Sequence, residues 1–280
     1  MSWPAPAKIN LFLHVLGRRE DGYHELQTAF LFLDYCDSLE FRPRQDQKIV
    51  RHANYDNVAE ENDIIVRAAN SLREQAQRPF GVDIHIDKRL PMGGGLGGGS
   101  SNAATTLVAL NSLFKLGLDR SELASIGLAL GADVPVFIAG EAAWAEGVGE
   151  QLRPISVPED WYLVVIPASP VATAEIFAAD DLTRNTAAIT IRDFLAGAGH
   201  NDCENVVRQR YPEVGEVLDW LGDRYETRMT GTGACVFARF KSREEAEKAG
   251  KSLPTGWRHF VAQGRNQSPL LRRLEQENTG

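Results

Sequence analysis

Residues 91–101 read Pro91-Met92-Gly93-Gly94-Gly95-Leu96-Gly97-Gly98-Gly99-Ser100-Ser101, so six of these eleven residues are glycine. Glycine permits positive φ and a close approach of backbone to a ligand, and amide groups exposed in this way form a nest for an anion. Residues 102–110 are rich in alanine and leucine and predict a helix, whose free amide groups and dipole favour a phosphate at its start. Residues 82–87 alternate apolar and polar side chains as a half-buried strand does. A glycine run between a strand and a helix indicates a phosphate-binding loop; the alternative is a flexible linker.

The glycine run does not match the two common nucleotide-binding patterns well. It lacks the lysine that a P-loop carries after its glycines, and Gly250-Lys251-Ser252 has Glu245 where the first glycine of that motif belongs. Gly93-x-Gly95-x-x-Gly98 fits the dinucleotide pattern, but a run this rich in glycine fits it almost automatically. Asp119 lies near the spacing of the acidic residue that the dinucleotide fold needs, yet it precedes a helical pattern and is expected to cap a helix.

Composition limits the class of protein. The chain has 280 residues, of which 43% are hydrophobic and 24% charged, which is an ordinary balance for one large or two ordinary globular domains. No apolar run reaches the ~18 residues of a membrane helix, and residues 1–8 lack the order of a signal peptide. The net charge of −8 argues against broad nucleic-acid binding. Three cysteines far apart (Cys36, Cys203 and Cys235), with no zinc-site spacing, are typical of reduced thiols, so we expect a cytoplasmic protein that binds neither nucleic acid nor membrane.

Periodicity predicts a mixed α+β chain in two parts. Pro154 and Pro158 mark a boundary between the parts, and residues 185–201 are poorly patterned and predict a loop. The expected strands are 8–16, 26–34, 38–42, 82–87, 142–146, 161–167 and 234–240, and the expected helices, besides the one after the glycine run, are 62–75, 121–130, 212–221 and 243–251.

Three further segments can carry chemistry, and each also has a purely structural interpretation. Lys8 and Asn10 share one face of a strand, where a lysine is most often solvated. Asp133 follows the helix that Gly131 ends, and it is either a turn or capping aspartate or a catalytic carboxylate. Residues 229–234 form a second glycine-rich turn, which alone would be only a tight turn before a strand.

Taken together and in order, these segments resemble the GHMP superfamily of small-molecule kinases nearly from end to end. The motifs that carry the resemblance are Pro6-Ala7-Lys8-Ile9-Asn10-Leu11, Asp21-Gly22-Tyr23-His24, Lys88 to Asn102, Gly131-Ala132-Asp133-Val134-Pro135-Val136-Phe137, Asn201-Asp202 and Thr230-Gly231-Thr232-Gly233-Ala234. The resemblance implies a two-domain α+β fold. Residues 1–153 would form an ATP-binding α/β domain like the second domain of ribosomal protein S5, and residues 154–280 a ferredoxin-like α+β domain, with substrate between them.

The resemblance also implies an activity, the transfer of a phosphoryl group from ATP to an alcohol, with Mg²⁺ as cofactor. Asp133 and Lys8 match the family's catalytic residues. The phosphate loop (Pro91, Met92, Gly93, Gly94, Gly95, Leu96, Gly97, Gly98, Gly99, Ser100 and Ser101) would hold ATP, with Lys88 as a neighbour of the adenine or phosphates. Ser100 or Ser101 would reach the metal ion, directly or through water.

The resemblance further implies a small-molecule substrate that carries a cytidine diphosphate group, and a monomer or weak homodimer. Asn10 would bind the alcohol part, Tyr23 and His24 would recognise the cytidine, and Phe177 would supply a second stacking face. Residues 62–65 read Asn-Asp-Ile-Ile where relatives often read Asn-Leu-Ile or Asn-Leu-Val, so the adenine contacts are not assigned. The rival classes are a GHMP kinase for a simpler alcohol and a catalytically silent binding protein; intact Asp133 and Lys8 argue against the second.

Overall fold

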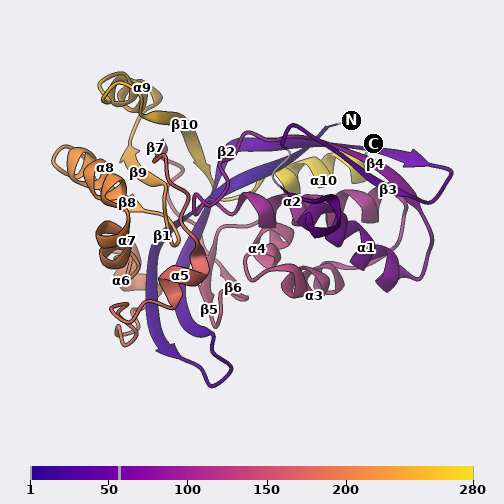
Figure 1. Ribbon diagram of the computed structural model, residues 1–280, viewed down its shortest axis with the longest axis horizontal. Coiled ribbons are helices and arrows are strands. Elements are labelled where there is room, and N and C mark those ends of the chain that lie inside the picture. Colours follow the sequence, from indigo (N-terminus) through magenta and orange to yellow (C-terminus); the bar gives the residue numbers. More distant parts are fainter. Residues whose placement is uncertain (1, 56–57, 280) are drawn as a thin grey trace.

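Two long antiparallel strands, β1 (Ser2–Arg18) and β2 (His24–Arg44), run through both lobes of the molecule (Figure 1). The structure is a computed structural model and describes residues 2–55 and 58–279. Strands were predicted at 26–34 and 38–42, and these are one strand. A shift of register between Pro6 and Lys8 of β1 lets β2 continue through the polar stretch 34–37, as a bulge does.

The first lobe is a sheet with helices on one face (Figure 1). Its strands follow the order β3-β4-β2, with β1 and β5 also paired to β2. The pair β3 and β4 is parallel, whereas the pairs that β2 forms with β1, β4 and β5 are antiparallel. The strands besides β1 and β2 are β3 (Ile49–Ala53), β4 (Gly81–Asp87), β5 (Ala143–Glu146) and β6 (Gln151–Pro154), and the helices are the short η1 (Glu60–Asn62), α1 (Ile64–Ala76), α2 (Gly98–Leu113), α3 (Arg120–Leu130) and α4 (Val134–Ala139).

The core of this lobe lies between the sheet and the helices. Phe30 and Phe32 of β2 belong to one buried cluster, whose other members include Leu72 of α1, Leu107 of α2 and Phe137 of α4. The helix α2 is buried on most of its sides, which its high content of alanine permits, because small side chains let neighbouring elements approach. This burial fixes the start of α2, which is the end of the glycine loop.

The second lobe has the order of a ferredoxin-like unit, in which a strand-helix-strand pattern is repeated. Its sheet follows β10-β7-β9-β8, with every pair antiparallel. The elements are β7 (Trp161–Ile166), α5 (Thr173–Phe177), α6 (Ile191–Leu195), α7 (Glu204–Arg210), α8 (Pro212–Gly222), β8 (Thr227–Met229), β9 (Val236–Phe240), α9 (Arg243–Lys251) and β10 (Arg258–Arg265).

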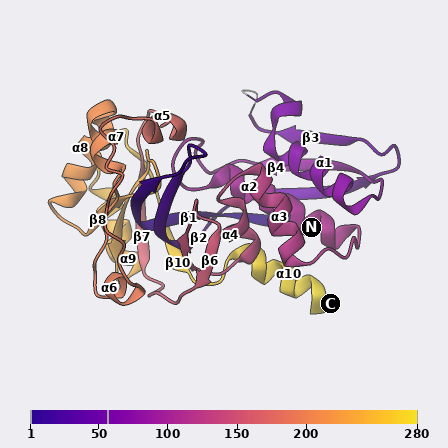
Figure 2. The ribbon, with the colours of Figure 1, turned by 90° about the horizontal axis from the view of Figure 1, so that it is seen from below.

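Chain segments cross between the two lobes in both directions. Leu13 and Val15 of β1 belong to the core of the second lobe. At the other end, β10 pairs with β2, and the helix α10 (Pro269–Thr279) returns to the first lobe, where Leu270 is buried (Figure 2). The domain boundary at residue 153 stays a prediction. The helix α10 follows that boundary in the sequence but packs on the first lobe.

The predicted ends of the helix that became α3 are confirmed. Asp119 forms a capping box with Glu122 at the start of α3, as expected, and Gly131 ends that helix. The region 185–201 is less irregular than predicted, because Thr190 and Asp193 form a second capping box that starts α6. Within the described residues, no helix is both long and apolar enough to cross a membrane.

Candidate active site

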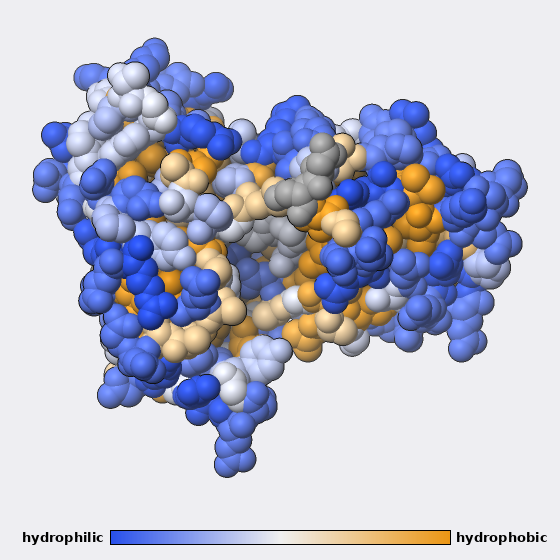
Figure 3. Space-filling view, in the orientation of Figure 1, coloured by the Kyte–Doolittle hydropathy of each residue, from blue (hydrophilic) through white to orange (hydrophobic). Residues whose placement is uncertain are grey.

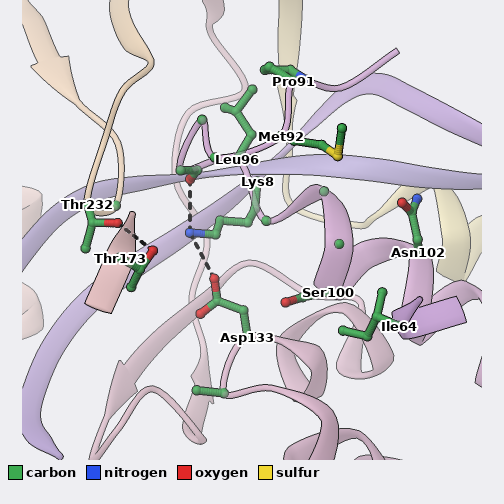
Figure 4. A pocket seen from close by; sticks show the side chains of 18 of the residues that line it. Lys8, Ile64, Pro91, Met92, Leu96, Ser100, Asn102, Asp133, Thr173 and Thr232 are labelled. Carbon is green, nitrogen blue, oxygen red and sulfur yellow. Dashed lines mark hydrogen bonds and ion pairs between the residues drawn. The ribbon is translucent and has the colours of Figure 1, made fainter. Parts of the chain in front are cut away.

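A cavity of about 620 Å³ lies between the lobes, and Figure 3 shows the surface hollowed there. Its wall includes the glycine loop, residues of β1 and β2, and the two residues that precede α4, Ala132 and Asp133. The second lobe contributes Thr173 and Phe177 of α5 and the turn residues Gly231 and Thr232. The Thr173 and Thr232 hydroxyl groups lie 2.9 Å apart, so the two segments of the second lobe are joined at the cavity wall (Figure 4).

The glycine loop turns its carbonyl groups toward the protein and leaves its amides free. The carbonyl of Gly93 accepts from Val171 N and Ala234 N, that of Gly94 from Cys235 N, that of Gly95 from Thr230 Oγ1, and that of Leu96 from Lys8 N, over 3.0–3.3 Å. In the described part of the chain, the amides of residues 93–97 donate no hydrogen bond. Gly97 caps α2, so the free amides of the first helical turn continue the same row.

Positive φ angles at Gly93, Gly95 and Gly97 produce this orientation. A Cβ atom at Gly95 would overlap the Thr230 carbonyl oxygen, and one at Gly97 would lie 2.8 Å from the Phe137 ring. The glycines therefore allow the loop to pack closely on the protein as well as to expose its amides.

Lys8 and Asp133 form an ion pair below the loop, with 3.2 Å between Nζ and Oδ2 (Figure 4). Lys8 is only 3% exposed, so the solvated interpretation of this lysine is wrong. Its Nζ also donates to Asn10 Oδ1 at 2.5 Å and to the Gly95 carbonyl at 3.3 Å. One ammonium group thus connects strand β1, the phosphate loop and α4.

Asp133 occupies the N-cap position of α4, but its side chain makes no capping hydrogen bond. The carboxylate lines the cavity instead and is one-third exposed. The two interpretations of Asp133 are therefore separable: the backbone is at a cap position, whereas the carboxylate faces Lys8 and the cavity.

A buried carboxylate that was not predicted from the sequence binds the residues on both sides of the glycine loop. Asp37 of β2 is fully buried and accepts four hydrogen bonds. Its donors are Lys88 Nζ at 2.5 Å, Arg89 N at 2.7 Å, Leu90 N at 2.8 Å and Asn102 Nδ2 at 2.9 Å. The residues before the loop and the first turns of α2 are thereby fixed to one anchor. In the sequence it lies between the two strands expected at 26–34 and 38–42, and no role was assigned to it.

Lys88 and Asn10 line the cavity as expected, but both are engaged within the protein. Lys88 donates to Asn102 Oδ1 at 3.1 Å in addition to Asp37. Asn10 donates from Nδ2 to Thr28 Oγ1 at 2.9 Å. Their free hydrogen-bonding capacity is therefore small and directional.

The two serines at the end of the loop differ. Ser100 lines the cavity. Ser101 is fully buried, and its Oγ is one of the buried polar atoms without a partner in the described part of the chain. Among the described residues, no group of three or more histidine, cysteine, aspartate or glutamate side chains could hold a metal ion.

The expected base-recognition residues are only partly brought together. Phe177 lines the cavity and stacks on His24, with ring centroids 5.1 Å apart and planes at 23°. Burial, followed by the charges of Arg184 and Arg18, lowers the pKa of His24. Tyr23 is 63% exposed and is not part of the cavity wall. Phe177 therefore packs on His24, whereas neither His24 nor Tyr23 is among the residues that line the cavity.

The opposite end of the cavity contains residues that the sequence reading left unassigned. Tyr55 and Asp63 line it, and the Tyr55 hydroxyl donates to Asp63 Oδ2 at 2.7 Å. Asp63 also caps α1 through Ile65 N and binds Arg51 at 2.5 Å. The polar residue that departs from the relatives' pattern is thus a buried helix cap.

Comparison with known proteins agrees with this geometry. Family models match residues 63–141, as the N-terminal domain of GHMP kinases, and residues 182–259, as their C-terminal domain. The chain therefore belongs to the GHMP family of small-molecule kinases.

Within that family, the chain is similar over its whole length to proteins named 4-diphosphocytidyl-2-C-methyl-D-erythritol kinase. It is 58% identical to the one from Halorhodospira halophila over 282 residues, which cover 99% of this chain and 98% of that protein. It is 56% identical to the one from Pseudomonas aeruginosa over 275 residues, 98% of each. A crystal structure of 4-(cytidine 5'-diphospho)-2C-methyl-D-erythritol kinase aligns with a TM-score of 0.80 at 33% identity, over 94% of this chain and 99% of that one. A mevalonate kinase aligns with a TM-score of 0.69 at 18% identity, over 95% of this chain and all of that one, which shows the shared fold.

Proposed function

We propose that this kinase transfers the γ-phosphoryl group of ATP to the 2-hydroxyl of 4-diphosphocytidyl-2-C-methyl-D-erythritol, in the non-mevalonate route to isoprenoids. The observation that carries the chemistry is the Lys8–Asp133 ion pair, which lies under a loop of free amides in the cavity. The substrate is supported by full-length relatives of that name at more than half identity.

In this mechanism, Asp133 orients the attacking hydroxyl and accepts its proton. A positioned base must lie within hydrogen-bond reach of the proton that it takes, and the exposed part of this carboxylate faces the cavity. Lys8, held by Asn10 and Gly95, places its ammonium 3.2 Å from this carboxylate and so helps to orient it. The same ammonium offsets charge on the phosphoryl group in transit, because phosphoryl transfer depends mainly on positioning and electrostatic stabilisation.

ATP would lie with its phosphates on the amides of Gly93 to Ser100. The amide of Ser101, which was also expected to take part, donates instead to the Gly97 carbonyl at 2.8 Å. The loop carbonyls are already occupied, so donors dominate the surface that faces the cavity. Mg²⁺ would neutralise phosphate charge there, and it is commonly held by one or two protein oxygens together with phosphates and water. Ser100 fits this role because it lines the cavity; Ser101 is buried and would need to move.

The substrate would extend from Asp133 past Asn10 toward α5. Asn10 would bind the methylerythritol hydroxyls, and Tyr23, His24 and Phe177 would bind the cytosine. Phe177 and His24 already lie against each other, whereas the ring of Tyr23 is largely exposed and would be placed against the base on binding.

The test is an ADP-release assay over a panel of alcohols. We expect turnover only with the diphosphocytidyl substrate, and none with homoserine, galactose or mevalonate. Asp133→Asn protein serves as the control for contaminating kinases. Turnover of a simpler alcohol at comparable kcat/KM would overturn the substrate assignment and leave the kinase fold standing.

We further propose that the enzyme is cytoplasmic and a monomer or weak homodimer. Cys203 and Cys235 are buried free thiols and Cys36 is partly buried, a pattern that suits a reducing compartment. Light scattering across a range of protein concentrations tests the oligomeric state, and a stable tetramer would contradict it.

A further inference from the structure

Arg184, in the segment between α5 and α6, contacts both residues of the His24–Phe177 ring pair, of which Phe177 lines the cavity. Its Nε donates to His24 Nε2 over 3.0 Å. The remaining donors of the guanidinium hold the backbone around Phe177, with Nη2 bonded to the carbonyls of Phe177 and Ala179 at 3.0 and 2.6 Å, and Nη1 to that of Leu182 at 3.2 Å. One side chain therefore fixes both the imidazole and the loop that carries the aromatic ring.

This contact determines where the imidazole carries its proton. A guanidinium has donors and no acceptor, so the histidine nitrogen that it meets must be the acceptor. With Nε2 as acceptor, neutral His24 carries its proton on Nδ1. Burial and the neighbouring positive charge also lower the pKa of His24, which keeps the ring neutral.

The other nitrogen is the one available to a ligand. His24 Nδ1 makes no hydrogen bond within the described chain, and it is not among the fully buried polar atoms without a partner. The residue as a whole is 7% exposed, and its ring stacks on Phe177. The structure therefore presents one oriented N–H donor on His24, beside the ring of Phe177, which lines the cavity.

We propose that Arg184 is a positioning residue that makes the site select cytosine over uracil, by fixing His24 as an Nδ1–H donor. This inference rests on the proposed function, in which His24 faces the base. Cytosine presents an acceptor at N3, whereas uracil carries a hydrogen there. A fixed donor pairs with the first and leaves the second with two donors facing each other.

The first experiment measures the inhibition constants of CDP and UDP against the diphosphocytidyl substrate, at saturating ATP. Wild-type enzyme prefers CDP, and in Arg184→Ala the UDP/CDP ratio of inhibition constants falls about tenfold, since one mismatched buried hydrogen bond costs about 1.4 kcal/mol. The ratio of the two inhibition constants reports the His24 tautomer and not a general loss of binding, because loosening of the Phe177 loop weakens stacking on both bases alike. Arg210→Ala is the matched control: Arg210 donates to the Glu175 carbonyl of α5 over 3.1 Å and pairs with Asp181, without touching His24.

The second experiment reads the tautomer in the wild-type protein, with no variant needed to fold. Long-range ¹H–¹⁵N spectra of histidine-labelled protein, with His24 assigned through His24→Gln, show a protonated Nδ1. A protonated Nε2 in the wild type overturns the inference, as does an unchanged UDP/CDP ratio in folded Arg184→Ala. If wild-type enzyme phosphorylates the substrate without preferring CDP, the inference fails and the kinase activity stands; if the substrate is not turned over, the proposed function itself fails.

Discussion

The phosphate end of the cavity, around Lys8 and the glycine loop, differs from the proposed base end, around Phe177. At the first, the side chains are already held by hydrogen bonds within the protein; at the second, they are held less. At the phosphate end, Lys8 is buried and bonded to two side chains and one carbonyl, and a buried carboxylate, Asp37, anchors the loop. At the base end, Tyr23 is largely exposed, and Phe177 packs on His24 where a base is expected. Charge stabilisation depends on groups that are already oriented, whereas a stacking face can form when the ligand arrives. We therefore expect substitutions at the phosphate end to lower kcat strongly, and substitutions at the base end to raise KM for the substrate more modestly.

The largest expected effect is that of Asp133→Asn, which keeps the shape of the side chain and removes the proton acceptor. We expect kcat to fall by 10²–10⁴-fold, the usual contribution of a positioned base, while ATP binding persists. Lys8→Ala should lower kcat similarly and also weaken substrate binding. Steady-state kinetics with calorimetry of ATP binding check both.

A matched control for this change is Asp119→Asn. Asp119 also occupies a helix N-cap position, where asparagine is an equally good cap, so kcat and stability should hold. Near-normal turnover of Asp133→Asn would remove this carboxylate from the mechanism.

Asp37→Asn tests whether the phosphate end is prearranged by its buried anchor. The change leaves the Lys88 ammonium without its charged partner in a buried position, and breaking such a pair costs about 3 kcal/mol of unfolding free energy. Urea unfolding measures this loss. Asp46→Asn, at an exposed ion pair with Arg44, should leave stability unchanged. Equal stability of the two variants would mean that the loop does not depend on its anchor.

Gly99→Val tests the loop itself. A Cβ atom at Gly99 meets no protein atom within 4 Å, so an added side chain projects into the cavity. Gly97→Val should abolish ATP binding too, but there the new atoms meet Phe137 and Lys8, which mixes packing with binding. We expect Gly99→Val to weaken ATP binding about tenfold or more, or at least 1.4 kcal/mol, with normal folding by circular dichroism.

The control is Gly222→Val, at the end of α8, where an added Cβ atom also meets nothing. If ATP affinity is the same in both variants, the amides near Gly99 do not hold the phosphates.

The structure of the phosphate end was easier to predict from the sequence than that of the base end, because it depends more on local signals. Glycine spacing, helix starts and caps are local, so the loop, α2 and the Asp119 cap were predictable. Contacts such as that of Asp37 with Lys88 join residues about fifty positions apart, and no local pattern indicates them. The strand break expected near residue 35 was wrong because pairing with β1 overrides the local polar signal. The pairing of Arg184 with His24 joins residues 160 positions apart and was not foreseen either.

The smallest expected effects lie at the base end, and they sharpen the comparison most. Stacking on one aromatic face is worth ~1–3 kcal/mol per base, so Tyr23→Ala should raise KM for the diphosphocytidyl substrate about tenfold. KM for ATP should stay the same, because Tyr23 lies outside the cavity wall that holds the phosphate loop.

Phe177→Ala, compared with Tyr23→Ala, tests whether an aromatic ring already packed in the protein contributes more to binding than one that is exposed. Phe177 supports the His24 ring as well as offering a stacking surface, so its loss should raise KM more than the loss of Tyr23. If binding energy from the base also aligns the hydroxyl with Asp133, kcat falls together with KM; if the base only binds, kcat holds. A rise in KM for ATP instead would mean that these rings face the adenine, and the two ends of the cavity would have to be exchanged. No change in either KM would leave a GHMP kinase for a simpler alcohol as the better description.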